Sequence, residues 1–370
     1  MPIMQFCQST LPPTPSTPRV TPMKATPQNR RDRFLELFPK EPAFRWKQIE
    51  KAFYTRGMNS WDDVTTLSKT MREEITELPW VSYTAHEVHM SNKKDTYKAI
   101  LTMADGQRIE TVLMENRRGQ WTICVSSQVG CAMGCTFCST GKMGFIRNLS
   151  VDEISDQYRF WKWFLAKHPS MPERISNVVF MGMGEPLNNY VNVKETILLW
   201  LRQTDLGHSK ITVSTVGVIP ILKGLVEDPE WPHVRIALSL HSADTQTRNE
   251  IVPTSYDNFL PELQEWCEEY LHQSGNRKHH LTFEYVMLQD VNDTEMHSDK
   301  LADFCHAVGV SQVKVNLIPY NFTDLGFQRS IHERTERFRA DLEADHITVT
   351  VRKTMGDDIA AACGQLITIS

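Results

Sequence analysis

Four of the eight cysteines in this 370-residue chain lie between residues 124 and 138. Cys131, Cys135 and Cys138 form a C-x₃-C-x₂-C loop directly after an apolar, strand-like stretch. In a reducing compartment, such a group of cysteines binds a metal or takes part in catalysis more often than it forms disulfides. Three thiolates so close in sequence can converge on one centre, which predicts a metal site at residues 131–138.

Two kinds of metal centre could use these three thiolates. A structural zinc site takes four protein ligands, yet no histidine lies between His89 and His168 to complete one. A cubane iron–sulfur cluster normally binds four cysteines, so three would leave one iron open. S-adenosylmethionine (SAM) can fill that position with its amino and carboxylate groups. The spacing favours an open [4Fe-4S] cluster, with zinc or a purely structural cluster as the alternatives.

Strand and helix patterns alternate from residue 121 onward, which predicts a parallel sheet. Six or seven such units suit a full or partial (β/α) barrel of the TIM type, whose active site lies at the carboxyl ends of the strands. Polar or glycine-rich residues follow several strands: 182–185, 214–215, 239–241 and Asn316. We expect strands within 121–130, 177–185, 210–217, 234–242, 280–288, 312–321 and 346–354, and helices at 151–168, 191–203, 259–273, 295–308 and 333–344.

The part of the chain before the barrel divides into three segments. Residues 1–30 are rich in proline and threonine and contain no acidic residue, which indicates a disordered tail or, as the alternative, a targeting segment. Residues 31–94 have helical periodicity and predict a small accessory domain. Residues 95–120 predict a β-hairpin around Asp105-Gly106, and residues 121–368 form the barrel domain.

Composition limits the class of protein. No apolar run approaches the roughly 18 residues that a helix needs to cross a bilayer, and no secretory signal is evident, so we expect a soluble, cytoplasmic protein. The formal net charge of −5 argues against a uniformly basic surface. Eight basic and four acidic residues between 30 and 60 could still form a local nucleic-acid contact, although an ordinary solvated helix face explains them equally well.

The cysteine loop resembles the motif of the radical SAM superfamily, and longer motifs resemble one family within it. Residues 125–145 are similar to the RlmN family of adenine carbon-2 RNA methyltransferases, and the similarity extends over residues 35–366. The other motifs that carry it are GMGEPL (182–187), TVSTVGV (212–218), LSLH (238–241), TFEYVML (282–288), VNLIPYN (315–321) and RKTMGDDIAAACGQL (352–366).

The resemblance implies a radical mechanism, because carbon 2 of adenine is electron-poor. Cys363 takes a methyl group from one SAM, and a second SAM on the cluster yields the radical that activates this methyl for addition to carbon 2. Glu110 accepts the proton from carbon 2, and Cys124 resolves the adduct as a transient disulfide. The resemblance also implies SAM contacts at Gly184, Glu185, Ser214, Ser239, Leu240, His241 and Asn316. The implied partners are an RNA substrate, rRNA or tRNA, and a reductant. The implied enzyme is a monomer.

Each implied role has a simpler alternative. Cys363 could be a small buried side chain, Cys124 a core residue or a fourth ligand, and Glu110 a solvated strand carboxylate. Cys7 lies in the tail, and Cys267 and Cys305 fall on helical patterns where packing explains them.

The chain also departs from the family pattern, with Met355 where arginine is usual and Phe322 where proline is usual. The first departure concerns RNA affinity or target choice, because the usual arginine would contact a phosphate or the substrate. Arg352 or Lys353 could supply that contact instead. Two alternative functions remain: a related carbon-8 (Cfr-like) methyltransferase, and a non-catalytic iron–sulfur or zinc protein that binds RNA.

Overall fold

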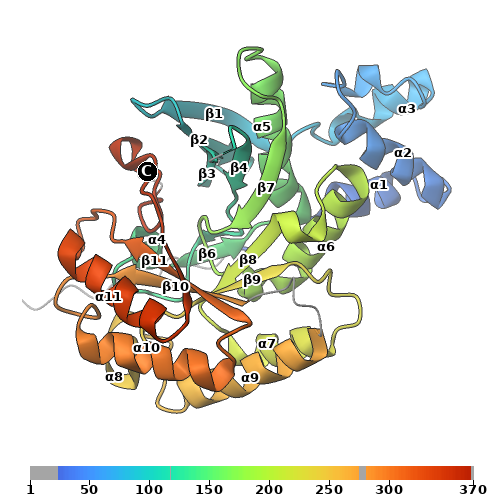
Figure 1. Cartoon of the computed structure of the whole chain (residues 1–370). Helices are drawn as coiled ribbons and strands as arrows, with labels where there is room; N and C mark the ends of the chain where they lie inside the picture. Colours follow the sequence, from blue (N-terminus) through green and yellow to red (C-terminus); the bar gives the residue numbers. More distant parts are fainter. Residues whose placement is uncertain (1–23, 117, 275–280, 368–370) are drawn as a thin grey trace, which may run out of the picture.

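A large mixed sheet runs through the computed structural model, which describes residues 24–116, 118–274 and 281–367. Its ten strands follow the order β1-β2-β3-β4-β7-β8-β9-β10-β11-β12 (Figure 1). The strands are β1 Tyr83–Met90, β2 Thr96–Met103, β3 Arg108–Glu115, β4 Trp121–Cys124, β7 Ile175–Phe180, β8 Ile211–Thr215, β9 Arg235–Ser239, β10 Leu281–Met287, β11 Val313–Pro319 and β12 Thr348–Val351.

The strands from β4 to β12 pair in parallel, and β1, β2 and β3 extend the sheet with antiparallel pairing. Because β1 and β12 are opposite edges of the sheet, the barrel is partial and open, as the sequence predicted. The expected hairpin is present as β2 and β3, and it is continuous with the barrel sheet. Residues 128–130 (β5) pair separately with residues 145–148 (β6).

Helices cover the outer side of the parallel strands (Figure 1). Five lie where the periodicity predicted them: α5 Val151–Ala166, α6 Tyr190–Gln203, α9 Phe259–Ser274, α10 Glu295–Val308 and α11 His332–Ala344. Three shorter helices were not predicted: α4 Ser139–Met143, α7 Ile219–Glu227 and α8 Thr245–Ile251. Among the described residues, no helix is both long enough and apolar enough to cross a membrane.

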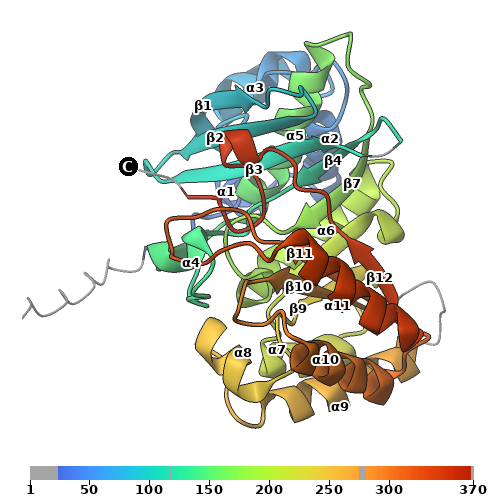
Figure 2. The ribbon, with the colours of Figure 1, turned by 60° about the vertical axis from the view of Figure 1, so that its left-hand side comes forward.

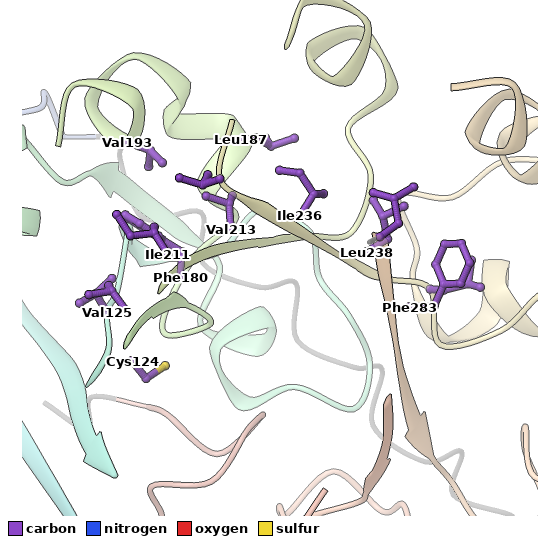
Figure 3. Packing of buried hydrophobic residues seen from close by; sticks show 14 of the residues in the cluster. Cys124, Val125, Phe180, Leu187, Val193, Ile211, Val213, Ile236, Leu238 and Phe283 are labelled. Carbon is purple, nitrogen blue, oxygen red and sulfur yellow. The ribbon is translucent and has the colours of Figure 1, made fainter. Parts of the chain in front are cut away.

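The main core lies between the parallel strands and these helices. Val213, Ile236, Leu238 and Phe283 come from three neighbouring strands and pack together in it, all at most 1% exposed (Figure 3). Burial on both faces explains the continuous apolar runs in the sequence. Cys124 belongs to the edge of the same cluster. The strand ends that carry polar residues are therefore fixed by a rigid apolar interior.

The N-terminal unit is helical only as far as residue 77. It contains α1 Arg30–Leu37, α2 Ala43–Phe53, α3 Lys69–Glu74 and two short 3₁₀ turns, at 61–63 and 75–77, around an apolar cluster of its own. The expectation of a helical segment up to residue 94 is wrong, because residues 83–90 form β1. This strand is mostly exposed, so it lacks the apolar alternation that would have predicted it.

The expected boundary of the disordered tail at residue 30 also changes. The backbone N–H of Lys24 donates to Ile146 O at 3.0 Å, and Asn29 Oδ1 accepts from the N–H of Val151 at 3.0 Å. The segment just before α1 therefore contacts the barrel domain. The rest of the expected tail, residues 1–23 with Cys7, lies outside the described residues.

Buried charges join the N-terminal unit to α5. Asp156 is fully buried on α5 and accepts from Arg30 Nη2 at 2.9 Å, from the N–H of Ser82 at 2.7 Å, and from Arg159. Arg159 Nε also donates to Phe53 O at 3.1 Å. Arg30 has a second carboxylate partner in Asp152, at 3.0 Å, whereas Arg159 pairs with Asp156. Loss of the Asp156 charge would therefore leave the buried Arg159 guanidinium without its counter-charge.

Replacement Asp156→Asn should therefore lower the free energy of unfolding by about 3–5 kcal/mol, because it leaves buried guanidinium charge uncompensated. Urea denaturation followed by tryptophan fluorescence measures the change. Glu73→Gln is the control, since Glu73 is exposed and pairs with exposed Lys69 at 3.8 Å; its effect should be about 0–1 kcal/mol. Equal effects of the two replacements would contradict this description of the junction.

Candidate active site

A cavity of about 160 Å³ opens at the carboxyl ends of the parallel strands. It brings together many of the residues that the sequence singled out. The cavity wall includes, from that set, Cys131, Cys135, Cys138, Gly184, Glu185, Ser214, Ser239, His241 and Cys363. Four of the candidate residues do not line it: Glu110, Cys124, Leu240 and Asn316.

The cysteine loop is held against the barrel by its own backbone. The N–H of Cys138 donates to Cys135 O at 3.1 Å, and the N–H of Thr136 donates to Ile251 O at the end of α8 at 3.0 Å. The loop is largely enclosed, and burial raises the pKa of Cys131 to about 12 and that of Cys135 and Cys138 above the ordinary range. A metal must displace these thiol protons, because the thiolate is the ligand.

The 182–185 turn approaches the backbone of the segment after β4 very closely. A Cβ on Gly182 would lie 2.7 Å from Val125 O, and one on Gly184, whose φ is +96°, would lie 2.4 Å from Gln128 Cβ. Ser126 Oγ accepts from the N–H of Met183 at 2.9 Å. Glycine is therefore required at both positions for the turn to lie at the cavity wall.

The Glu185 carboxylate is buried and bonded on both oxygens. Oε1 accepts from the N–H of Leu187 at 3.0 Å, and Oε2 accepts from the N–H of Val216, just after β8, at 2.9 Å. Burial raises the pKa of Glu185 to about 7, although these N–H groups oppose the shift. Glu185 thus fixes the end of β8 while its carboxylate faces the cavity.

His241 is buried with a positive φ of 57° and faces the cavity beside Phe137. Burial, with a smaller effect of the Arg248 charge, lowers the pKa of His241 to about 3, so the ring is neutral. Nδ1 accepts from the N–H of Val286 at 3.2 Å. The ring proton is therefore assigned to Nε2, which makes His241 a hydrogen-bond donor and not a base.

Two candidates outside the cavity wall act through their neighbours. Asn316 Nδ2 donates to Glu284 Oε1 at 3.0 Å, and Glu284 lines the cavity. Leu240 is completely buried, and its backbone N–H donates to Glu284 O at 3.1 Å. Ser214 Oγ and Ser239 Oγ lie 3.2 Å apart at the ends of β8 and β9. Asn316 and Leu240 therefore hold Glu284 at the cavity wall, which Ser214 and Ser239 also line.

Cys363 lies in an exposed turn after the 3₁₀ turn at 357–359. Its sulfur lies 3.7 Å from Arg352 Nη1, and its carbonyl accepts from Asn321 Nδ2 at 3.0 Å. Arg352 Nη2 also lies 3.3 Å from Glu284 Oε1. Figure 2 shows the segment after β12 running back across β2 and β3, and Cys363 in this segment lines the cavity.

Cys124 lies behind this turn, at the end of β4. It is 6% exposed, and burial, with the nearby Cys363 second, raises its pKa to about 12. The Arg352 charge acts on both cysteines and partly opposes this shift. The described cysteines form no disulfides, so Cys124 and Cys363 are neighbouring free thiols. Cys267 and Cys305 are fully buried on α9 and α10, as packing residues should be.

Glu110 is enclosed beneath the C-terminal segment. It is 1% exposed, its Oε1 lies 3.2 Å from Lys98 Nζ, and its Oε2 accepts from the N–H of Ile367 at 3.1 Å. Burial raises the pKa of the Glu110 carboxyl, with Lys98 opposing the shift. Glu110 is therefore no solvated strand carboxylate, and the 363–367 segment must move before it can contact a substrate.

The residues present fit an open iron–sulfur cluster with SAM. Among the described residues, no three His, Cys, Asp or Glu side chains are placed to hold a single metal ion, which disfavours a preformed zinc site. A cubane cluster places each thiolate on a different iron, so its ligands need not meet at one point. Glu284 Oε2 is buried without a hydrogen-bond partner, and a SAM amino or hydroxyl group could supply the missing donor.

Sequence reasoning did not identify three residues of this region. Glu284 lies inside the motif TFEYVML but had no expected role, and Arg352 in RKTMGDD was expected only as a substitute for the RNA contact of the usual arginine at 355. Arg248 lies outside every motif and gave no signal.

The two departures from the family pattern lie outside the strands. Met355 is half-buried. The Phe322 side chain is 71% exposed, and its carbonyl accepts from Gln365 Nε2 at 2.9 Å.

Comparison with known proteins identifies the family to which the chain is similar. Residues 125–301 match the model of the radical SAM superfamily. A probable dual-specificity RNA methyltransferase RlmN from Acaryochloris marina is 39% identical over 328 residues, which cover 88% of this chain and 89% of that protein. A dual-specificity RNA methyltransferase RlmN from Marinomonas sp. is 39% identical over 349 residues, 91% of each.

One solved structure is similar along nearly the whole length. The crystal structure of a radical SAM methyltransferase from Sphaerobacter thermophilus is 36% identical and covers 91% of this chain and 96% of that one, with a TM-score of 0.82. The two sequence relatives show the family, and the superfamily match and this structural similarity are consistent with it. The chain belongs to the RlmN family of radical SAM RNA methyltransferases.

Proposed function

We propose that this chain methylates carbon 2 of adenosine in RNA and that Cys363 carries the methyl group. The position of Cys363 is the observation that supports the proposal most strongly. Its side chain lines the same cavity as the 131–138 cysteines, and the charge of Arg352 acts on both it and Cys124. A carrier cysteine needs SAM on one side and a second thiol within reach; Cys363 lines the cavity proposed for SAM and acts electrostatically on Cys124.

The cavity is where the cofactors would bind. A [4Fe-4S] cluster on Cys131, Cys135 and Cys138 would supply the electron that cleaves one SAM to a 5′-deoxyadenosyl radical. A second SAM donates the methyl group, so two SAM molecules are used per turnover. The proposed SAM contacts are Gly184, Glu185, Ser214, Ser239, Leu240, His241 and Asn316, the last of these through Glu284.

Cys363 acts first as a nucleophile. Its sulfur forms a bond to the methyl carbon of SAM, the methyl–sulfonium bond breaks, and S-adenosylhomocysteine leaves. Arg352 Nη1, 3.7 Å from this sulfur, holds it at the mouth of the cavity. Because the turn that carries Cys363 is exposed, an RNA base can approach the carried methyl from outside.

Glu110 and Cys124 complete the reaction. After a hydrogen atom is removed from the carried methyl, its carbon bonds to carbon 2 of adenine and leaves an unpaired electron on the base, and Glu110 takes the proton from carbon 2. Cys124 then attacks the Cys363 sulfur, the carbon–sulfur bond breaks, and a disulfide forms. The remaining unpaired electron would return to the cluster held by Cys131, Cys135 and Cys138. The methylene left on the base takes a proton from water to become the methyl group. An external dithiol or protein reductant returns two electrons to the disulfide.

The RNA substrate and the setting follow from the same chemistry. A base must be unpaired or extruded to reach an enclosed site, which favours looped segments such as those of large-subunit rRNA and the tRNA anticodon arm. A reducing cytoplasm would keep the cysteines free between turnovers. A single copy of the chain contains every residue used above, so we propose that it acts as a monomer.

Replacement Cys124→Ala should trap the RNA on Cys363, because nothing then breaks the carbon–sulfur bond. We expect purified Cys124→Ala protein to carry covalent RNA and to stop after one cycle. Denaturing gel electrophoresis detects the adduct, and sequencing of the RNA identifies the target. Cys305→Ala, a buried cysteine on α10, is the control and should turn over normally. If the Cys124→Ala protein is free of RNA and turns over normally, Cys124 is not the resolving cysteine. If the wild-type product is methylated at carbon 8, the carbon-2 assignment is wrong.

Release of RNA from the wild-type adduct should accelerate with pH. Burial raises the pKa of Cys124 to about 12, so below that pH its reactive thiolate increases roughly tenfold per unit. Single-turnover release measured between pH 7 and pH 9 tests this, with Cys124→Ala as the pH-independent control. A release rate in the wild type that does not change with pH would show that Cys124 deprotonation does not limit resolution.

Replacement Glu110→Gln should separate the two halves of the reaction. Cys363 should still be methylated, whereas methylated RNA should fall by about 10²–10⁴-fold, as expected for loss of a general base. Peptide mass spectrometry measures the first quantity, and nucleoside analysis measures the second. Glu115→Gln on the exposed end of the same strand should change neither. Normal RNA methylation by Glu110→Gln would exclude Glu110 as the base.

A further inference from the structure

Arg248 on α8 carries a guanidinium group that is completely buried. Its Nη2 donates to Val216 O at 2.7 Å, and its Nη1 donates to Ser239 O at 3.1 Å and to Leu240 O. Within residues 24–116, 118–274 and 281–367, no carboxylate forms an ion pair with it, and its Nε is buried without a partner. Among the described residues, this interior cation is thus held by carbonyl dipoles and an aromatic ring, without a carboxylate.

A buried cation without a counter-ion is unfavourable in an apolar interior. Burial accordingly lowers the pKa of Arg248 to about 10. The three carbonyl oxygens and the Phe259 ring, whose centroid lies 4.3 Å from Arg248 Cζ, compensate only part of this cost. Nothing in the reaction proposed above uses this charge. A negatively charged group bound nearby would compensate the rest of the Arg248 charge.

The nearest candidate for that negative group is the cysteine loop. Helix α8 ends at Ile251, whose carbonyl accepts from both the N–H and the Oγ1 of Thr136, at 3.0 and 3.3 Å. Arg248 lies one turn earlier on the same helix, and it and Cys135 act on each other electrostatically. The carbonyls of Val216 and Ser239 that it holds belong to residues of the cavity wall. Arg248 therefore lies at the base of the proposed cluster site.

We propose that Arg248 is the internal counter-charge of the iron–sulfur cluster and makes the cluster easier to reduce. This inference rests on the proposed ligands Cys131, Cys135 and Cys138. Three thiolates give a [4Fe-4S] cluster a net negative charge, and one-electron reduction adds another. A fixed positive charge stabilises the reduced form more than the oxidised form, so it raises the reduction potential.

A purely structural role is the competing explanation, because Arg248 also joins the ends of β8 and β9 through three carbonyls. Charge and shape can be separated by two replacements. Arg248→Met removes the charge and keeps an apolar stem of similar length. Arg248→Lys keeps the charge but cannot donate to all three carbonyls in the same geometry. If the charge matters, Arg248→Met should be impaired and Arg248→Lys should not. If only the hydrogen-bond geometry matters, both variants should be impaired.

The test is the midpoint potential of the cluster in anaerobically reconstituted full-length protein, followed by electron paramagnetic resonance during a redox titration. We expect Arg248→Met to shift the potential to a more negative value and Arg248→Lys to stay near the wild type. Lys300→Met is the matched control, since Lys300 is a half-exposed cation that pairs with Asp244 at the start of the same helix. It should leave the potential unchanged.

Each outcome decides between the explanations. If Arg248→Met takes up no cluster while Arg248→Lys does, the requirement for charge is supported at the level of cluster binding. An unchanged potential in cluster-loaded Arg248→Met, or equal losses in both variants, would overturn the inference and leave the proposed ligands intact. Failure of the wild type itself to bind a cluster would overturn the ligand assignment and this inference together.

Discussion

The Arg352 guanidinium connects the three parts of the site that the chemistry must bring together. Its Nη2 lies 3.3 Å from Glu284 Oε1 on the cavity wall and 3.4 Å from Met181 Sδ, and its Nη1 lies 3.7 Å from Cys363 Sγ. Its charge also acts on Cys124. Cys363 belongs to an exposed turn outside the helices and strands, so its placement depends on contacts of this kind.

The fold supplies the fixed frame for that contact. Parallel strands direct their carboxyl ends to one opening, and the glycines at 182 and 184 let the turn after β7 lie against residues 125–128. Glu185 then fixes the end of β8 through its bond to Val216. The opposite wall, which carries the cysteine loop, is tied to α8 through Thr136. A rigid half-barrel thus surrounds the site, and Glu110 lies beneath the C-terminal segment, where it accepts from the N–H of Ile367.

Sequence patterns predicted the parallel strands, five helices and most of the cavity wall, because these depend on local periodicity and contiguous motifs. They missed β1, which is mostly exposed and has no apolar alternation, and α8, which is short and polar. The roles of Arg248 and Arg352 could not be predicted either. Each arises from partners distant in the chain, such as Val216 for the first and Glu284 for the second. Only the folded arrangement shows that Arg248 has no carboxylate partner among the described residues and that Arg352 contacts Cys363.

The central claim is that the transferred carbon passes through Cys363 and loses one hydrogen on the way. Turnover of the wild-type enzyme with SAM that carries a trideuterated methyl group tests it most directly, with the isotopic composition of the methyladenosine read by mass spectrometry. A methyl group with two deuterium atoms and one hydrogen from water is the result that this account predicts. A product that retains all three deuterium atoms would show direct transfer of an intact methyl group and would contradict it.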